Sequence, residues 1–177
     1  MNNRNIARAA VLIAVCVVLG YVFLPIPNLE MITAGIFLAG IWMGCAYGLV
    51  IGFLAEMIFS LTNPMGLPML PTLGAQVVGM SLAGFMGGFL RNELRNAEFY
   101  ARTSLFIHIK LGCAGLLITT FFDLLTNLSF IWIGGLSAPV LLGAIPFVVV
   151  HVLVNTLTFA LLIPIVLQRL PVWKESR

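Results

Sequence analysis

The chain has 177 residues, of which 61% are hydrophobic and only 8% are charged. Soluble domains carry about 25% charged residues, so this composition excludes a soluble protein and also a disordered one. The net charge of +3 does not indicate a nucleic-acid partner, because the cations flank apolar segments instead of forming one basic face. The sequence predicts one integral membrane domain over residues 1–177, with no room for a soluble catalytic domain.

The first predicted membrane span covers residues 6–24 and ends at Pro25 and Pro27. Arg4 and Arg8 precede this span, as basic residues precede the apolar stretch of a signal peptide. The apolar stretch is longer than that of a signal peptide, however, and no small-residue cleavage site follows it. We therefore expect an uncleaved helix.

Residues 31–62 are apolar apart from Glu56. One helix of that length would measure about 48 Å, which exceeds the roughly 30 Å hydrocarbon core of a bilayer. The segment therefore predicts two spans, 31–43 and 46–62, joined by a tight turn near Gly44.

The rest of the chain predicts three more spans, separated by segments that cannot continue a helix. Residues 63–71 hold three prolines and one glycine, residues 91–104 are polar, and residues 134–139 form a short turn. The three spans cover residues 72–90, 105–133 and 140–167. The expected fold is thus an all-α bundle of six transmembrane helices.

With six spans, all nine Lys and Arg residues fall on one side of the membrane, and the loops on the other side carry none. The cations are Arg4, Arg8, Arg91, Arg95, Arg102, Lys110, Arg169, Lys174 and Arg177. Because cytoplasmic loops are enriched in Lys and Arg, we expect both termini in the cytoplasm.

Three acidic residues lie apart from these cations. Glu30 opens the second span at its outer end, whereas Glu56 and Asp123 lie inside apolar segments. An acid at the centre of a membrane helix costs about 2.5–3.5 kcal/mol on insertion scales, and no cation is expected at the same depth. These acids are therefore the strongest functional signal in the chain.

Polar residues near these acids share helix faces and depth. Asp123 and Asn127 lie one turn apart, as do His151 and Asn155, and residues with this spacing face the same side. A pocket in the outer half of the membrane, mostly apolar with a few convergent polar groups, is typical of small-molecule sites. The candidate ligand-binding residues are Glu30, Glu56, Asn63, Gln76, Asp123, Asn127, Trp132, His151 and Asn155.

Other interpretations of these residues remain open. Amides in membrane helices often bond only to neighbouring helices, and a lone histidine is often a satisfied core residue. A metal site formed by Glu56, Asp123 and His151 has a single imidazole, so we predict no metal and no cofactor. The chain also lacks catalytic motifs and paired cysteines, so we do not expect an enzyme.

Small residues recur at helical spacing in three places. Gly40, Gly44, Gly48 and Gly52 follow one another every fourth residue, and Gly84 and Gly88 repeat this spacing. Such rows let helix backbones approach closely. Ala10 and Ala14 in the first span follow the same rule near the cytoplasmic end. They either pack internally or receive a partner helix.

Several of these segments resemble the substrate-binding S components of energy-coupling factor (ECF) transporters. The similar segments are the A-x-x-x-A pattern of Ala10 and Ala14, residues 38–56 (LAGIWMGCAYGLVIGFLAE) and residues 63–84 (NPMGLPMLPTLGAQVVGMSLAG). Members often have proline after the glycine of the turn between spans two and three, where this chain has Cys45.

The resemblance implies that the chain binds a vitamin or related micronutrient from outside, in a pocket covered by outer loops. It also implies a multi-pass protein of the bacterial cytoplasmic membrane. Ala10 and Ala14 would dock on a transmembrane coupling subunit driven by two ATPase subunits. Thiamine-like, cobalamin-like and queuosine-precursor-like ligands all fit. Two alternatives remain: a rod-shape-determining scaffold without a ligand, and an ion-coupled transporter that uses Glu56 and Asp123.

Overall fold

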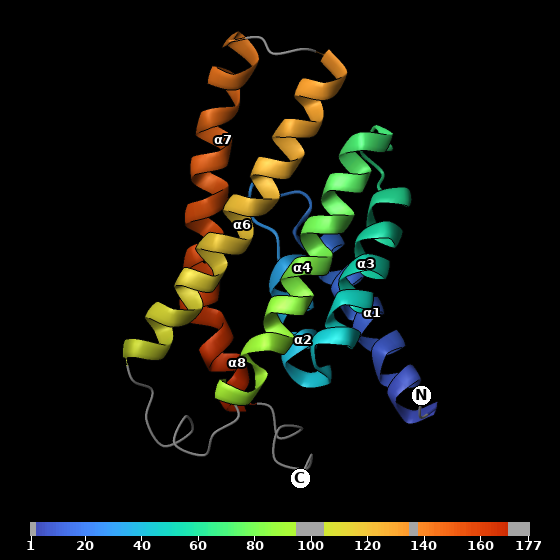
Figure 1. The fold of residues 1–177 in the computed structure, drawn as a ribbon, viewed down its shortest axis with the longest axis vertical. Coiled ribbons are helices and arrows are strands. Elements are labelled where there is room, and N and C mark those ends of the chain that lie inside the picture. Colours follow the sequence, from blue (N-terminus) through green and yellow to red (C-terminus); the bar gives the residue numbers. More distant parts are fainter. Residues whose placement is uncertain (1–2, 95–104, 135–137, 170–177) are drawn as a thin grey trace.

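The computed structural model describes residues 3–94, 105–134 and 138–169, and all regular secondary structure in these ranges is helical (Figure 1). Residues 138–169 form one continuous helical rod, the last in the chain, which contains a short π-helix, η1. The elements are α1 (Asn3–Phe23), α2 (Ile32–Met43), α3 (Cys45–Leu61), α4 (Leu70–Leu94), α6 (Leu105–Gly134), α7 (Ala138–Leu157), η1 (Thr158–Leu162) and α8 (Ile163–Arg169).

Four helical segments are long and apolar enough to cross a membrane: Asn3–Phe23, Leu70–Leu94, Leu105–Trp132 and Leu142–Arg169. The helices α2 and α3 are shorter, with 12 and 17 residues. At 1.5 Å per residue, α2 is only about 18 Å long. The all-helical membrane fold is as expected, and four of the six predicted spans reach membrane length, whereas α2 and α3 are shorter apolar helices.

A turn at Gly44 separates α2 from α3, at the position that the apolar run length indicated. Gly44 has a φ of 93°, in the left-handed region that residues with a Cβ rarely adopt. Its amide closes α2 by donating to the carbonyl of Gly40 over 2.7 Å. The chain therefore reverses here within a single residue.

The helix ends that carry the described cations lie together at one end of the bundle (Figure 1). This end holds the start of α1, the end of α4, the start of α6 and the end of α8. Lys110 pairs with Glu93 there, which ties α6 to α4. The cations in the described part of the chain are Arg4, Arg8, Arg91, Lys110 and Arg169. Arg95, Arg102, Lys174 and Arg177 lie outside the described residues.

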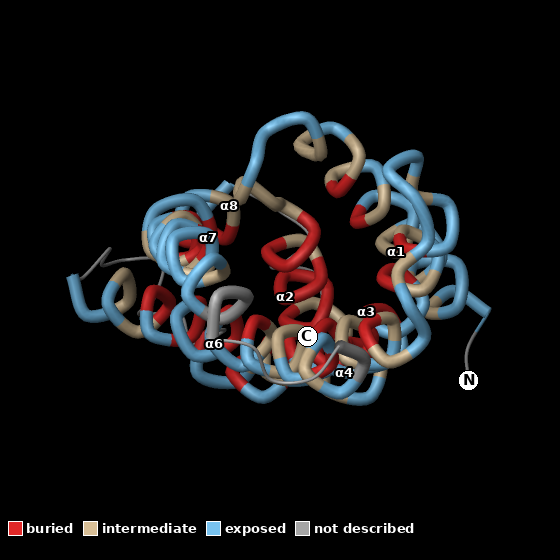
Figure 2. Tube along the Cα trace, turned by 90° about the horizontal axis from the view of Figure 1, so that it is seen from above, coloured by how far each residue is buried: buried red, intermediate tan, exposed pale blue. Residues whose placement is uncertain are grey.

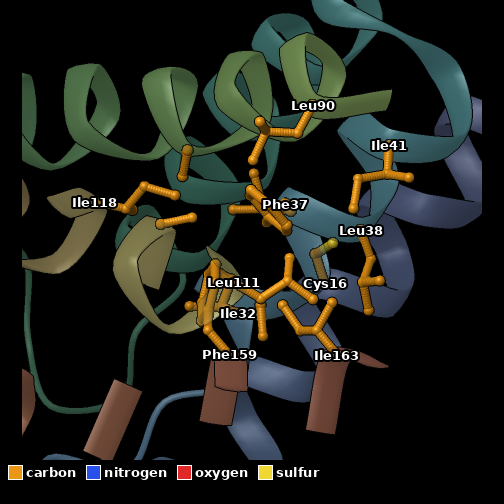
Figure 3. Close-up of a cluster of buried hydrophobic side chains, with 14 of the residues drawn as sticks. Cys16, Ile32, Phe37, Leu38, Ile41, Leu90, Leu111, Ile118, Phe159 and Ile163 are labelled. Atoms are coloured by element: carbon orange, nitrogen blue, oxygen red, sulfur yellow. The ribbon is translucent and has the colours of Figure 1, made fainter. Parts of the chain in front are cut away.

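Helix α2 lies at the centre of the bundle, surrounded by the other helices (Figure 2). Nearly all of its residues are buried. Phe37 of α2 packs on Phe159 of η1, with ring centroids 5.0 Å apart. Cys16, Leu111 and Ile163 complete the apolar core around it (Figure 3). The burial of these apolar side chains against α2 stabilises the bundle by about 25 cal/mol per Å² of apolar surface removed from water.

The glycine rows form the contact between α2, α3 and α4. A Cβ added to Gly40 would lie 2.0 Å from the carbonyl oxygen of Gly84, and one added to Gly48 would lie 2.2 Å from the same atom. Any larger residue would force the helices apart. This close packing holds α3 against α4 and so sets the position of Glu56 relative to Gln76.

The π-helix η1 precedes Pro164, which has no amide hydrogen and disturbs the carbonyl four residues before it. That carbonyl belongs to Ala160, and it accepts a hydrogen bond from Nδ1 of His108 over 2.6 Å. Since a carbonyl can only accept, the proton must lie on this ring nitrogen. His108 of α6 thus satisfies a backbone group that the proline leaves unpaired.

Candidate functional site

His151 of α7 lies between two carboxylates from other parts of the chain. Its Nδ1 is 2.8 Å from Oδ1 of Asp123 on α6, and its Nε2 is 3.3 Å from Oε1 of Glu30 in the α1–α2 connection. His151 and Asp123 are 9% and 7% exposed. Thr33 donates to the same oxygen of Glu30 over 2.6 Å. These contacts join α2, α6 and α7.

The chemistry of imidazole sets the charge of this arrangement. A neutral imidazole has one N–H and can donate to one carboxylate only, whereas an imidazolium donates from both nitrogens. If both carboxylates are ionised, His151 satisfies Glu30 and Asp123 together only in the protonated form. Two carboxylates and one imidazolium leave a net charge of −1.

Glu56 forms a second group with residues of α3 and α4. It is 2% exposed, and its Oε1 accepts a hydrogen bond from Ser60 over 2.8 Å. Ser60 Oγ also lies 3.4 Å from Oε1 of Gln76. Thr33, which donates to Glu30, also lies 3.5 Å from Sδ of Met80, one turn from Gln76 on α4, so the two groups belong to one region of the bundle.

Asn155 is the most deeply buried amide in the described chain, with 0% of its surface exposed. It lies one turn from His151 on α7 and shares its face. We call the whole set the polar cluster. Its members are Glu30, Thr33, Glu56, Ser60, Gln76, Asp123, His151 and Asn155.

Several atoms of the polar cluster have no hydrogen-bond partner within the described ranges. They are Glu56 Oε2, Asp123 Oδ2, and both Oδ1 and Nδ2 of Asn155. An unpaired buried polar atom costs about 1–3 kcal/mol, and more if it is charged. Buried groups of this kind are expected where a protein keeps its hydrogen-bonding capacity for a ligand.

Three predicted site residues lie outside the polar cluster and form no described hydrogen bond to its side chains. Asn127 donates to the backbone carbonyl of Asp123 over 2.7 Å, so it bonds within α6. Asn63 accepts from the amide of Met65 over 2.9 Å and so shapes the turn after α3. Trp132 is 86% exposed near the end of α6.

Two cluster members were not among the residues predicted from sequence. Ser60 lies one turn from Glu56, and Thr33 lies just under one turn from Glu30. Hydroxyl groups at these spacings from an acid are a usable signal, because residues three or four apart on a helix face each other. Thr and Ser are common in membrane helices, so this signal is weak when taken alone.

The histidine and the acids are not arranged to hold a metal ion. No group of three His, Cys, Asp or Glu side chains in the described segments could hold one. The two carboxylates approach His151 from opposite ring nitrogens, so they do not converge on one point. Within the same segments Cys16, Cys45 and Cys113 are free thiols.

Ala10 and Ala14 are exposed on α1, whose only buried residues are Cys16 and Gly20. Beside this helix lies a cavity of about 320 Å³. Apolar side chains of α1, α2 and the last helical rod line it, among them Leu12, Leu19, Leu38, Leu162 and Val166. Most of α1 is thus available for contact with lipid or with another membrane helix.

The described part of the chain is a helical bundle with four helices of membrane length, which defines a polytopic membrane protein, and it contains a buried cluster of acids, imidazole and amides. The family model for the ECF transporter, substrate-specific component, matches residues 4–173. The chain therefore belongs to this family of transport proteins, which confirms the resemblance found in the sequence. Neither a curated protein nor a solved structure matches the chain.

Proposed function

We propose that this protein is the substrate-binding subunit of an ATP-driven micronutrient importer, with the polar cluster as its binding site. The observation that carries this proposal is the set of buried, unpaired atoms on Glu56, Asp123 and Asn155. They offer a ligand several hydrogen bonds that the described chain does not use. A structural scaffold would have no reason to keep these groups unpaired, because each of them costs stability.

In this proposal the remaining predicted residues lie around the cluster. Asn63 belongs to the connection between α3 and α4, and Trp132 lies near the end of α6 that faces away from the cations. Both would contact the ligand when the loops at this end cover it. Asn127 would keep Asp123 in place through the bond to its backbone.

We further propose a six-helix topology with both termini in the cytoplasm of a bacterium. The gathering of the described cations at one end of the bundle supports this orientation, because cytoplasmic loops are rich in Lys and Arg. The apolar core around Phe37 lies nearer this end than the polar cluster does. The site would then open to the outside and be closed toward the cytoplasm.

The importer also requires partners that hydrolyse ATP. We propose a transmembrane coupling subunit and two ATPase subunits, with the exposed Ala10 and Ala14 of α1 as the docking contact. Small residues at this spacing let a partner helix approach closely. The chain itself would bind and deliver the substrate without catalysing a reaction.

Mass spectrometry of the protein purified in mild detergent tests this function. We expect a bound small molecule and, under gentle conditions, the coupling and ATPase subunits. Recovery of neither from several detergents and growth media would contradict the proposal. A scaffold protein would give that result, and it would also tolerate the combined substitution Glu56→Gln and Asp123→Asn in cells.

A proton-coupled transporter is the second candidate, because Glu30, His151 and Asp123 form a row of titratable groups. Such rows occur in membrane proton relays. This candidate predicts uptake that continues without the ATPase subunits and stops when the proton gradient is collapsed. Our proposal predicts uptake that requires the ATPase subunits and continues when the proton gradient is collapsed.

A further inference from the structure

We propose that the ligand of the polar cluster is a small cationic nitrogen compound, such as a protonated amine or an amidinium, and that compounds carrying a carboxylate or phosphate are excluded. This inference rests on the proposed binding function and specifies its substrate class. It follows from the balance of charge in the cluster and from its balance of donors and acceptors.

The charge of the cluster is not compensated by the described chain. Glu30, Asp123 and a protonated His151 carry a net charge of −1, and an ionised Glu56 adds another. The five described Lys and Arg residues all belong to helix ends at the opposite end of the bundle. At 1.5 Å per residue along the helices, Asp123 is about 20 Å from Lys110 and His151 is about 27 Å from Arg169. Buried charges are normally paired, so a cation is the matching occupant.

The unpaired atoms favour the same class of ligand. Glu56 Oε2, Asp123 Oδ2 and Asn155 Oδ1 are acceptors, whereas Asn155 Nδ2 is a donor. A ligand that satisfies the three acceptors must supply N–H or O–H groups. Hydrogen bonds between a cationic N–H and a carboxylate are about twice as strong as neutral ones.

Asn155 provides evidence that is independent of the acids. It is neutral, it is 0% exposed, and both of its amide atoms lack a partner in the described part of the chain. Its shared face with His151 directs it toward the cluster. If the acids served only the stability of the bundle, an unpaired amide side chain beside them would not be required.

The polar cluster would repel an anionic ligand. A carboxylate would lie next to Glu56 and Asp123, and like charges at about 4 Å repel strongly where water is excluded. Among the unpaired atoms of the polar cluster, only Asn155 Nδ2 could donate to it. The cluster therefore selects against acids as well as for cations.

The first experiment identifies the compound that co-purifies with the wild-type protein, by native mass spectrometry and elemental composition. We expect a compound that is positively charged at pH 7. A neutral or anionic compound would overturn this inference and leave the proposed function intact. The absence of any compound, together with the absence of ATPase subunits, would overturn both.

The second experiment uses paired probes that differ at one substituent, which is a cationic aminomethyl group in one and a carboxylate in the other. The pairs are pyridoxamine with 4-pyridoxate, and 7-aminomethyl-7-deazaguanine with 7-carboxy-7-deazaguanine; thiamine serves as a permanent cation. Binding is measured by thermal shift and by calorimetry. We expect any binding to be confined to the cationic probes. Binding of either carboxylate as tightly as its cationic partner would contradict the inference.

A substitution at Glu56 tests whether this carboxylate distinguishes cationic from anionic ligands. Glu56→Gln keeps the shape of the side chain and removes its charge, and we expect the affinity for the cationic ligand to fall about tenfold or more. Glu93→Gln is the matched control, because Glu93 pairs with Lys110 at the far end of the bundle, and we expect it to change affinity less than twofold. If Glu56→Gln weakened a cationic probe and its carboxylate partner equally, Glu56 would only shape the site, and the inference would fail.

Discussion

His151 on α7 and Asp123 on α6 are joined by a 2.8 Å hydrogen bond between Nδ1 and Oδ1. Both residues are almost fully buried, and the second ring nitrogen of His151 faces Glu30. One side chain thus holds together two helices and the connection that precedes α2. The stability of the bundle and the integrity of the candidate site depend on the same residue.

The substitution His151→Phe should therefore affect both properties. It leaves Glu30 and Asp123 without their shared cation, and breaking a buried charge pair on one side typically costs about 3–5 kcal/mol. We expect a lower melting temperature in detergent and the loss of ligand binding. The variant Asn92→Ala, at an exposed position in the last turn of α4, serves as the control. Full ligand binding by His151→Phe would show that the polar cluster is not the site.

His108→Phe separates stability from binding. The substitution removes the donor to the Ala160 carbonyl and leaves that partly buried acceptor unpaired, at a cost of about 1 kcal/mol. We expect a lower free energy of unfolding in detergent, with an unchanged ligand affinity, because His108 lies well below the polar cluster in the bundle. A change of affinity larger than a few-fold would mean that η1 is coupled to the site.

Gly84→Ala tests the contact between α3 and α4. The added Cβ would lie 2.0 Å from the carbonyl oxygen of Gly48, so the two helices must move apart. We expect strong destabilisation, with poor yield or a melting temperature lowered by several degrees, and weaker ligand binding because Glu56 moves relative to Gln76.

Gly74→Ala is the matched control in the same helix. No atom lies within 4 Å of a Cβ added at Gly74, and alanine favours a helix over glycine by about 1 kcal/mol. We expect this variant to be as stable as the wild-type protein or more so. Equal melting temperatures for the two variants would show that the glycine contact is not tight.

The double substitution Ala10→Leu and Ala14→Leu tests the docking surface. Both alanines are exposed on α1, so leucines there should leave the fold and ligand binding intact while blocking the approach of a partner helix. We expect the coupling subunit to be lost in co-purification. Cys113→Leu, an exposed small residue on α6, is the control. Unchanged assembly of the double variant would exclude this surface as the docking site.

Much of the architecture could be predicted from patterns within single segments of the sequence. The length of the apolar run 31–62 required a reversal, and the structure has it at Gly44 with a positive φ. The glycine spacing indicated close helix contacts, and Gly40 and Gly48 both meet Gly84. The pattern behind each prediction lies within one apolar segment or one helix, so the sequence contains that information directly.

The composition of the polar site was also partly predictable. Glu56 and Asp123 were singled out because an acid inside an apolar helix is costly, and both are buried in the polar cluster. His151 and Asn155 were placed with them by depth and helix face. What this reasoning could not provide was the identity of each residue's partner.

Tertiary structure decided those partners. Glu30 lies just before α2, as its place at the start of the second span indicated. Because α2 is short and central, the connection from α1 brings Glu30 against His151. Asn63 and Asn127 each bond to nearby backbone, and these partners were not among the predictions. The amino-acid sequence alone was sufficient to predict a helical membrane protein with costly buried acids. Only the packing of helices far apart in the chain decided which of these groups meet, because their contacts depend on helix length and crossing instead of local spacing.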